Sequence, residues 1–305
     1  MKKEYPQVAY KIAIVIATAI WGLSFVFMKD AVEILPPAWL LGFRFCAAGL
    51  ILFVVLHRRV IRGMSRSTLA MGMVLGLFDF LAFLLQTIGL AHTTPGINAF
   101  LTATYCVIVP FAWWVIGRLK PTLANIGAAA IAIAGVWLVS VNGTAEHFEM
   151  GFGEGMTLMC AVVFAVHIVL VSKFAQRADA LVLTVIQFLT EGCLGLLIGA
   201  ATEQLPPTTA LTPELLGSMV FLVVFASVVA FGIQNVALAH VPPAQAALLL
   251  SLESVFGVIA SIVLYGEQIT VRLLFGFALI FVAILVSEVL PMKLGKVRPK
   301  RETES

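Results

Sequence analysis

Long apolar stretches alternate along the chain with short polar connections. Ten stretches of about 20 residues are apolar, which is the length that an α-helix needs to cross the hydrocarbon core of a bilayer. Steps such as Pro36-Pro37, Pro95-Gly96 and Pro242-Pro243 mark the connections. The pattern therefore predicts an all-α polytopic membrane protein with ten transmembrane helices. The stretches are residues 9–28, 37–56, 69–91, 96–117, 122–141, 154–173, 181–201, 214–237, 243–265 and 271–290.

Composition strengthens this prediction. Of the 305 residues, 61% are hydrophobic and 11% are charged, whereas soluble domains are about 45–50% apolar and about 25% charged. A disordered chain, a collagen and a secreted disulfide scaffold are thereby excluded. The net charge of +3 is too small and too dispersed for a nucleic-acid partner. The four cysteines lie in apolar stretches without a C-x-x-C pair, so we expect no metal, no redox chemistry and no cofactor.

The basic residues predict the orientation, because cytoplasmic loops retain Lys and Arg. With the N-terminus inside, 16 of the 19 basic residues lie on the cytoplasmic side. The other side has only Lys29 and Arg272, and Arg44 lies within the second helix. Lys29 is near a helix end, where we expect its side chain to reach water. We therefore expect a multi-pass protein of the bacterial inner or plasma membrane with both termini cytoplasmic. The basic tail, 291–305, is expected to lie on anionic headgroups.

A secretory signal peptide is the alternative for the first stretch. Lys2-Lys3, an apolar run and Ala17-Thr18-Ala19 resemble such a signal and its cleavage site. The apolar run continues to Met28, however, and the repeat described next requires this helix. A spanning helix is therefore favoured.

A five-helix unit occurs twice. Residues 86–96 read QTIGLAHTTPG and residues 234–244 read QNVALAHVPPA, a spacing of 148. Upstream the spacing is nearer 143, which pairs Trp21-Gly22 with Phe164-Ala165 and Arg44-Phe45 with Gln187-Phe188. We expect one repeat over 1–142 and another over 150–290. Because five is odd, the repeats must have opposite orientations, and inverted repeats are typical of secondary transporters that bind substrate between the halves.

Several short motifs lie in or beside the apolar stretches: Trp21-Gly22-Leu23-Ser24-Phe25, Arg44-Phe45, Gln86 to Thr94, Asn98 to Thr102, Val109-Pro110, Ser251-Leu252-Glu253 and Gly266-Glu267. With these motifs the chain resembles an EamA-type transporter of the drug/metabolite transporter superfamily from end to end. The resemblance implies a ten-helix exporter of small metabolites that does not hydrolyse ATP. Two positions depart from the family pattern: Ser254 stands where proline often follows the glutamate, and Gly117-Arg118 stands where the first half usually closes with Gly-Glu.

Polar groups at membrane depth are functional candidates, because ionisable residues there cost several kcal/mol. One helix face carries Asp79, Phe83 and Gln86, and the spacing of 148 maps these onto Ser227, Phe231 and Gln234. We expect a central cavity lined by helices 1, 3, 4, 6, 8 and 9. Its candidate substrate-binding residues are Trp21, Ser24, Arg44, Asp79, Phe83, Gln86, Asn98, Thr102, Tyr105, His167, Ser227, Phe231, Gln234 and Glu253.

Several of these residues have a structural alternative. Asp79 could pair with Arg44 as a buried ion pair, Glu253 could anchor neighbouring helices, and His167 could serve helix packing alone. Glu191 maps onto Ala48 of helix 2, and we expect it only to bond backbone or headgroup water. Asp79 and Glu253 are the candidates for proton coupling, since intramembrane carboxylates serve as proton relays. Gly72-x-x-x-Gly76 and Gly195-x-x-x-Gly199 predict close helix packing.

The sequence thus predicts a secondary active transporter rather than an enzyme, with no catalytic residues. It would export a small, partly apolar metabolite such as an amino acid by alternating access, with proton coupling. The expected partners are this metabolite, the lipid bilayer and protons, and the chain acts as a monomer or homodimer. A passive facilitator or an importer remains an alternative. An integral membrane enzyme acting on lipids is another, although carboxylates or His residues do not cluster at one interface.

Overall fold

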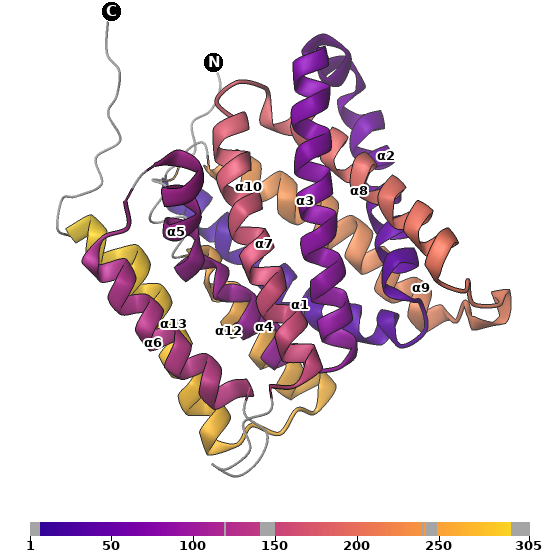
Figure 1. Cartoon of the computed structure of the whole chain (residues 1–305). Coiled ribbons are helices and arrows are strands. Elements are labelled where there is room, and N and C mark those ends of the chain that lie inside the picture. The colour runs from indigo at the N-terminus through magenta and orange to yellow at the C-terminus, as the bar shows by residue number, and fades with distance from the viewer. Residues whose placement is uncertain (1–6, 119, 141–149, 239–240, 242–248, 294–305) are drawn as a thin grey trace, which may run out of the picture.

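The computed structural model describes residues 7–118, 120–140, 150–238, 241 and 249–293, and its regular elements are helices (Figure 1). The first half contains α1 (Gln7–Val32), α2 (Pro37–Gly63), α3 (Arg66–Ala91), α4 (Pro95–Ala103), α5 (Tyr105–Gly117) and α6 (Leu123–Ser140). The second half contains α7 (Phe152–Phe174), α8 (Ala180–Thr202), the short 3₁₀-helix η1 (Thr208–Ala210), α9 (Pro213–Val220), the π-helix η2 (Phe221–Val229), α10 (Ala230–Leu238), α12 (Leu252–Ala260), the π-helix η3 (Ser261–Tyr265) and α13 (Val271–Lys293).

These elements confirm the prediction of an all-α polytopic membrane protein. Among the described residues, eight helical stretches are long and apolar enough to cross a membrane, and Leu252–Tyr265 and Val271–Ser287 are shorter apolar helices. The start of the ninth predicted stretch, 243–248, and most of the tail, 294–305, lie outside the described residues. Within the described residues, the ten predicted stretches therefore correspond to ten helical segments, several of them built from more than one element.

The fourth segment is divided at Thr104, between α4 and α5. The Thr104 hydroxyl donates a hydrogen bond to the Leu101 carbonyl at 2.6 Å, and the Thr104 amide donates to the same carbonyl at 3.2 Å. Local side-chain bonds of this kind compete with the regular helical ladder. The eighth segment is different, because α9, η2 and α10 follow one another without a break.

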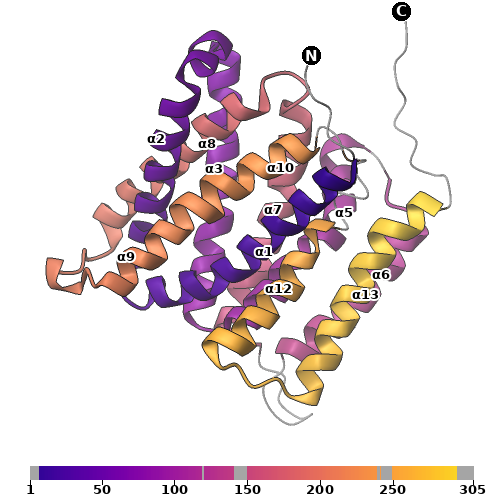
Figure 2. The same ribbon diagram turned by 180° about the vertical axis from the view of Figure 1, so that it is seen from behind.

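Helices at equivalent positions in the two halves pack against each other. α2 contacts α8, α4 contacts α12, and α6 contacts α13; Figures 1 and 2 show α6 and α13 side by side from opposite directions. These are the second and seventh, fourth and ninth, and fifth and tenth helical segments. The arrangement is that of two inverted repeats related by a pseudo-two-fold axis between the paired helices.

Glycines allow the closest helix contacts, as predicted from their spacing. A methyl group at Gly72 or Gly76 would lie 2.6 Å from a side-chain atom of α8. One at Gly195 or Gly199 would lie 2.5–2.9 Å from the nearest atom of α2. Both predicted motifs therefore bring α8 against its neighbours, and these contacts set the rotation of α8 in this conformation.

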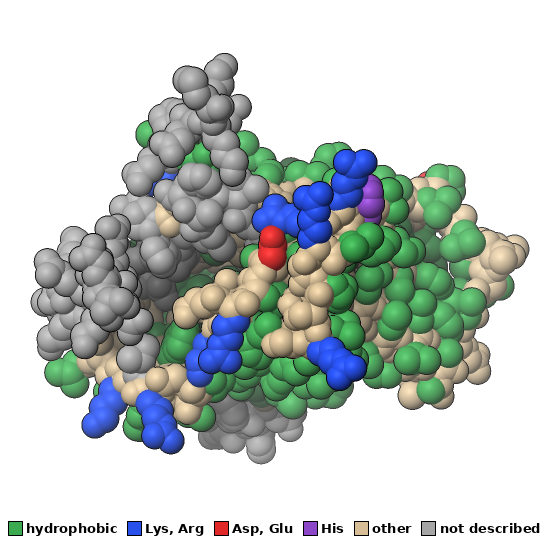
Figure 3. All heavy atoms as spheres, turned by 90° about the horizontal axis from the view of Figure 1, so that it is seen from above, with side chains coloured by type: hydrophobic (Ala, Val, Ile, Leu, Met, Phe, Trp, Pro, Cys, Tyr) green, Lys and Arg blue, Asp and Glu red, His purple; other side chains and the backbone are tan. Residues whose placement is uncertain are grey.

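Basic side chains gather at one end of the bundle (Figure 3). This end carries the α2–α3, α5–α6 and α7–α8 connections, where Lys173 donates to the Ile116 carbonyl at 3.0 Å. Arg59 of α2 and Asp179, which precedes α8, are joined there as well. The basic residues counted as cytoplasmic in these three connections therefore share one end of the molecule.

Candidate functional site

Six polar side chains from both halves meet in the interior and are called the charged cluster here. They share very low exposure, at most 7% each. The first half contributes two of them and the second half four. Hydrophobic residues surround them, so each polar atom must find its partner within the protein. The members are Arg44 (α2), Asp79 (α3), His167 (α7), Gln187 and Glu191 (α8) and Ser227 (η2).

Arg44 does not form the predicted alternative ion pair with Asp79, because no N–O distance of 4.0 Å or less joins them. Its Nε donates to Ser227 Oγ at 3.0 Å, and NH1 approaches Met28 Sδ at 3.2 Å. The guanidinium also lies 4.7 Å from the ring centre of Phe45 and 5.1 Å from that of Phe83. The cation is therefore held by one hydroxyl, one sulfur and two aromatic faces.

Asp79 belongs to a triangle of polar groups. Gln187 Nε2 donates to Asp79 Oδ2 at 2.6 Å, and His167 Nδ1 lies 3.5 Å from Asp79 Oδ1. The other ring nitrogen of His167 lies 3.4 Å from Gln187 Oε1. His167 thus contacts the acidic group of the opposite half and joins α7 to α3 and α8.

Glu191 contradicts our expectation of a residue bonded to backbone or headgroup water. Its exposure is 0%, and neither carboxyl oxygen receives a hydrogen bond in the described structure. It interacts instead with Asp79 and Arg44. The cause is the adjacent Gly192, whose backbone packs directly on Cys46 of α2. The spacing of Gln187 and Glu191, one helical turn apart beside Gly192 and Gly195, was the sequence signal that could have revealed it.

An aromatic row crosses the charged cluster and the pseudo-two-fold axis. Phe45 and Phe188 lie at its centre, with ring centres 5.2 Å apart. Phe83 lies next to Phe45, and Phe231 lies next to Phe188, each with ring centres 5.1 Å apart. Beyond them, Phe164 lies 5.2 Å from Phe83, and Trp21 lies 5.2 Å from Phe231. In order the row is Trp21, Phe231, Phe188, Phe45, Phe83, Phe164 and Tyr105, with the last two rings 6.3 Å apart.

The row follows the residue pairing that the repeat predicts. Trp21 pairs with Phe164, Phe45 with Phe188 and Phe83 with Phe231 in the two halves. The polar contacts obey the same rule: Arg44 donates to Ser227, and its mate Gln187 donates to Asp79, the mate of Ser227. Four rings of the row are among the candidate residues predicted from the sequence, and the structure adds Phe45, Phe164 and Phe188 to the row.

Three predicted residues form a buried polar group between α3 and α4. Gln86 Nε2 donates to Thr102 Oγ1 at 3.2 Å, and Asn98 Nδ2 donates to the Gln86 carbonyl at 3.2 Å and to Thr157 Oγ1 at 2.7 Å. Ser24 differs, because its hydroxyl donates to the Trp21 carbonyl of its own helix at 2.7 Å. These hydrogen bonds stabilise helix positions.

The remaining predicted residues are accessible. Exposure is intermediate for Trp21, Phe83, Tyr105, Phe231, Gln234 and Glu253. Within the described part of the chain, no hydrogen bond to the side chain of Gln234 or Glu253 is found. The accessible candidates therefore combine four aromatic rings with one amide and one carboxylate, whereas the other eight candidates are buried.

One end of the bundle is joined by charged side chains at helix ends. Glu267 accepts hydrogen bonds from Thr94 Oγ1 at 2.5 Å, from the Gly96 amide at 3.0 Å and from Ser261 Oγ. It thereby caps the N-terminus of α4 from the opposite half. Lys29 donates to the Leu90 carbonyl at 2.9 Å and is only 7% exposed, so our expectation that it reaches water is wrong.

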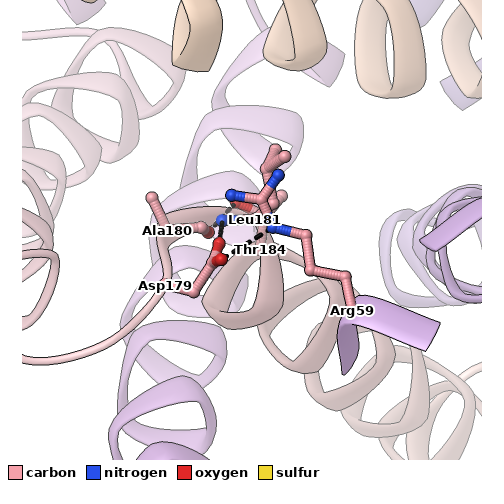
Figure 4. Close-up of polar contacts among 5 residues, drawn as sticks. All are labelled: Arg59, Asp179, Ala180, Leu181 and Thr184. Atoms are coloured by element: carbon pink, nitrogen blue, oxygen red, sulfur yellow. Dashed lines mark hydrogen bonds and ion pairs between the residues drawn. The ribbon is translucent and has the colours of Figure 1, made fainter. Parts of the chain in front are cut away.

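An exposed ion pair lies at the basic end of the bundle (Figure 4). Arg59 Nε donates to Asp179 Oδ2 at 2.7 Å, and the Leu181 amide donates to Asp179 Oδ1 at 3.0 Å. Partial burial raises the pKa of Asp179, but the bonds from Arg59 and Leu181 outweigh it and hold the pKa below its ordinary value. Asp179 thus caps α8 and ties it to α2.

The family model of the EamA-like transporters matches residues 9–141 and 151–288. An uncharacterized transporter of Archaeoglobus fulgidus is 24% identical over 275 residues, which cover 90% of this chain and 84% of that one. An S-adenosylmethionine/S-adenosylhomocysteine transporter of Chlamydia trachomatis serovar L2 is 24% identical over 225 residues, 70% of this chain and 69% of that one.

A solved crystal structure has the same fold, with a TM-score of 0.64 and 21% sequence identity, covering 94% of this chain and 99% of that one. The match of the family model extends over both halves, and the family is built from two repeats of five helices. The chain is therefore a multi-pass membrane protein that belongs to the EamA-like transporter family.

Proposed function

We propose that the protein is a secondary active transporter that exports a small, partly apolar metabolite by alternating access, with both termini in the cytoplasm. The observation that carries the proposal is the aromatic row, because its rings come from both halves and lie beside the charged cluster. Rocking of one half against the other would open such a site to each side of the membrane in turn. The basic end of the bundle supports the orientation.

The substrate is proposed to be an amino acid or a related metabolite with an apolar or aromatic part. Binding sites commonly combine apolar walls with a few placed polar groups, and the accessible residues Trp21, Phe83, Tyr105 and Phe231 with Glu253 fit that description. The relative named as an S-adenosylmethionine/S-adenosylhomocysteine transporter supports this class. Its named substrates join a purine ring to an amino-acid portion.

Proton coupling is the proposed energy source. Asp79 and Glu253 are carboxylic acids at membrane depth, where such groups serve proton relays. Asp79 occupies the position that neutral Ser227 has in the other half, so the fold does not require a charge there. Glu253 lies on α12 of the second half and is partly exposed.

Transport by purified protein in liposomes tests the function. A proton gradient should drive accumulation of at least one member of a metabolite panel. Phe83→Trp and Phe231→Trp should impair this transport without changing expression, because the larger rings crowd the aromatic row. Phe53→Trp is the matched control, since Phe53 is a lipid-facing ring of α2 with 37% exposure.

Three results would contradict parts of the proposal. Equilibration without accumulation would indicate a passive facilitator. Chemical conversion of a lipid by the protein would indicate an enzyme. If transport survived both substitutions unchanged, the aromatic row would be a packing surface rather than a substrate site.

A further inference from the structure

Asp79 and Glu191 lie at the same level on two neighbouring helices. α3 and α8 run side by side in the same direction, because Gly72 faces Ile186 and Gly76 faces Thr190. Asp79 is three residues beyond Gly76, and Glu191 is one residue beyond Thr190. The two carboxyl groups interact in this arrangement. They come from opposite halves of the molecule.

The pair lacks hydrogen-bond donors. Of its four carboxyl oxygens, only Asp79 Oδ2 accepts a hydrogen bond, from Gln187 at 2.6 Å; Asp79 Oδ1 and both oxygens of Glu191 accept none in the described structure. A buried ionised oxygen without a donor is strongly unfavourable. A proton on one carboxyl group supplies a donor, since the protonated acid can bond the other carboxylate.

The surrounding charges leave room for one such proton. Arg44 faces the pair from α2 and is the cation of the charged cluster. His167 faces Asp79 from α7 at 3.5 Å, and the thiols of Cys46 and Cys160 lie on α2 and α7. One guanidinium balances one carboxylate. One proton added to the two carboxyl groups then gives the pair and Arg44 together no net charge, which is the favourable state for charges removed from water.

We propose that Asp79 and Glu191 form a carboxyl pair that holds one proton between the two halves, and that this pair is the proton-coupling site. The coupling role rests on the transport function proposed above. A movement of one half against the other separates the carboxyl groups. The O–H bond then breaks and the proton passes to water on one side, and a proton taken from water on the other side re-forms that bond when the pair closes. Glu253 is left free to contact substrate.

Infrared difference spectroscopy of the purified full-length protein, between acidic and alkaline pH, tests the shared proton without any substrate. The wild type should show the C=O band of a buried protonated carboxyl group. Asp79→Asn and Glu191→Gln should each remove this band, because the remaining carboxylate is then ionised beside Arg44. Glu191→Asp retains an acid and should keep the band. The exposed Glu214→Gln is the control and should leave the band unchanged.

Two spectroscopic results would overturn the proposal. One is a wild type with no such band, which would leave His167 as the carrier of the proton. The other is a band that is lost only in Glu253→Gln. Size-exclusion chromatography identifies any variant that fails to fold. If Glu191→Gln fails to fold, the proposal is tested with Glu191→Asp, which should keep the infrared band, and Asp79→Asn, which should lose it.

Transport in liposomes tests the coupling role separately. Glu191→Gln should lose proton-driven accumulation completely yet keep the exchange of internal for external substrate, which needs no net proton movement. An unchanged pH profile of accumulation in both Glu191→Gln and Asp79→Asn would refute the coupling role. A wild type that transports nothing would instead refute the proposed function, while the infrared result would still decide whether the pair holds a proton.

Discussion

The contact between α2 and α8 predicts a specific cost for one added methyl group. At Gly195 an added Cβ would lie 2.5 Å from the Gly42 nitrogen, 2.7 Å from the Gly42 Cα and 2.9 Å from the Ala38 carbonyl oxygen. All three atoms belong to the backbone of α2, so no side-chain rotation can relieve the overlap. Gly195→Ala therefore requires the two helices to move apart.

The size of the effect follows from these distances. Non-bonded heavy atoms are most stable about 3.5–4.0 Å apart, so the helices must separate by about 1 Å. Overpacking of this kind costs about 1–3 kcal/mol, and the better helix propensity of alanine returns about 0.5–1 kcal/mol. We expect Gly195→Ala to lower the free energy of unfolding by about 1–2 kcal/mol.

Reversible unfolding of the purified protein in detergent measures this change. Gly217→Ala in α9 is the matched control, because no atom lies within 4 Å of the added methyl group; it should stabilise the protein by about 0.5–1 kcal/mol. If Gly195→Ala were as stable as Gly217→Ala, the close α2–α8 packing would be wrong, and with it the reason that Glu191 is buried.

Three further predictions concern the ends of the bundle. Reporter fusions after residues 64, 119 and 176 should be cytoplasmic and those after 147 and 208 external; a cytoplasmic signal at 147 would contradict the inverted orientation. Glu267→Ala should destabilise the protein by about 1 kcal/mol through loss of the α4 cap, whereas the exposed Glu33→Ala should be neutral in the same unfolding assay. Because the folded-state pKa of Asp179 is depressed, its contribution is present above the unfolded value of about 3.9 and is lost as pH falls through the folded value. Asp179→Asn should abolish this acid-dependent loss, which is below about 1 kcal/mol for an exposed pair, and equal acid sensitivity of mutant and wild type in pH titrations of stability would refute it.

Hydropathy predicted the helices because an apolar run of membrane length permits little else. The predicted stretches 37–56, 69–91 and 181–201 begin within a few residues of the start of α2, α3 and α8. Ser65 caps the start of α3 and Asp179 caps the start of α8. Hydropathy could not predict the π-helix of Phe221–Val229. An apolar run has the same composition whether its hydrogen bonds span four residues or five.

The site was predictable where the repeat related one half to the other. The mapping of Asp79, Phe83 and Gln86 onto helix 8 predicted from the sequence alone that Ser227 and Phe231 would lie with them, and the structure places both beside the charged cluster or in the aromatic row. The burial of Glu191 was not predicted, because the equivalent residue in the first repeat is Ala48. The repeat therefore gave no information about a polar contact at this position. The burial of Glu191 depends on the rotation of α8, which the glycine contacts with α2 determine, and hydropathy does not report rotation.

The charges break a symmetry that the aromatic contacts keep. Arg44 and Gln187 occupy equivalent positions in the two repeats and make equivalent hydrogen bonds. The fold therefore accepts either a cation or a neutral amide at that position. The same break occurs at the bundle ends, where Glu267 caps α4 but its mate position has Arg118, whose side chain is exposed and has no acceptor atom. Two identical halves would give two conformations of equal energy. In the proposed alternating-access cycle, a cap of about 1 kcal/mol would favour the conformation joined at Glu267 by about fivefold. The binding of one proton and one substrate molecule would be enough to reverse a bias of that size.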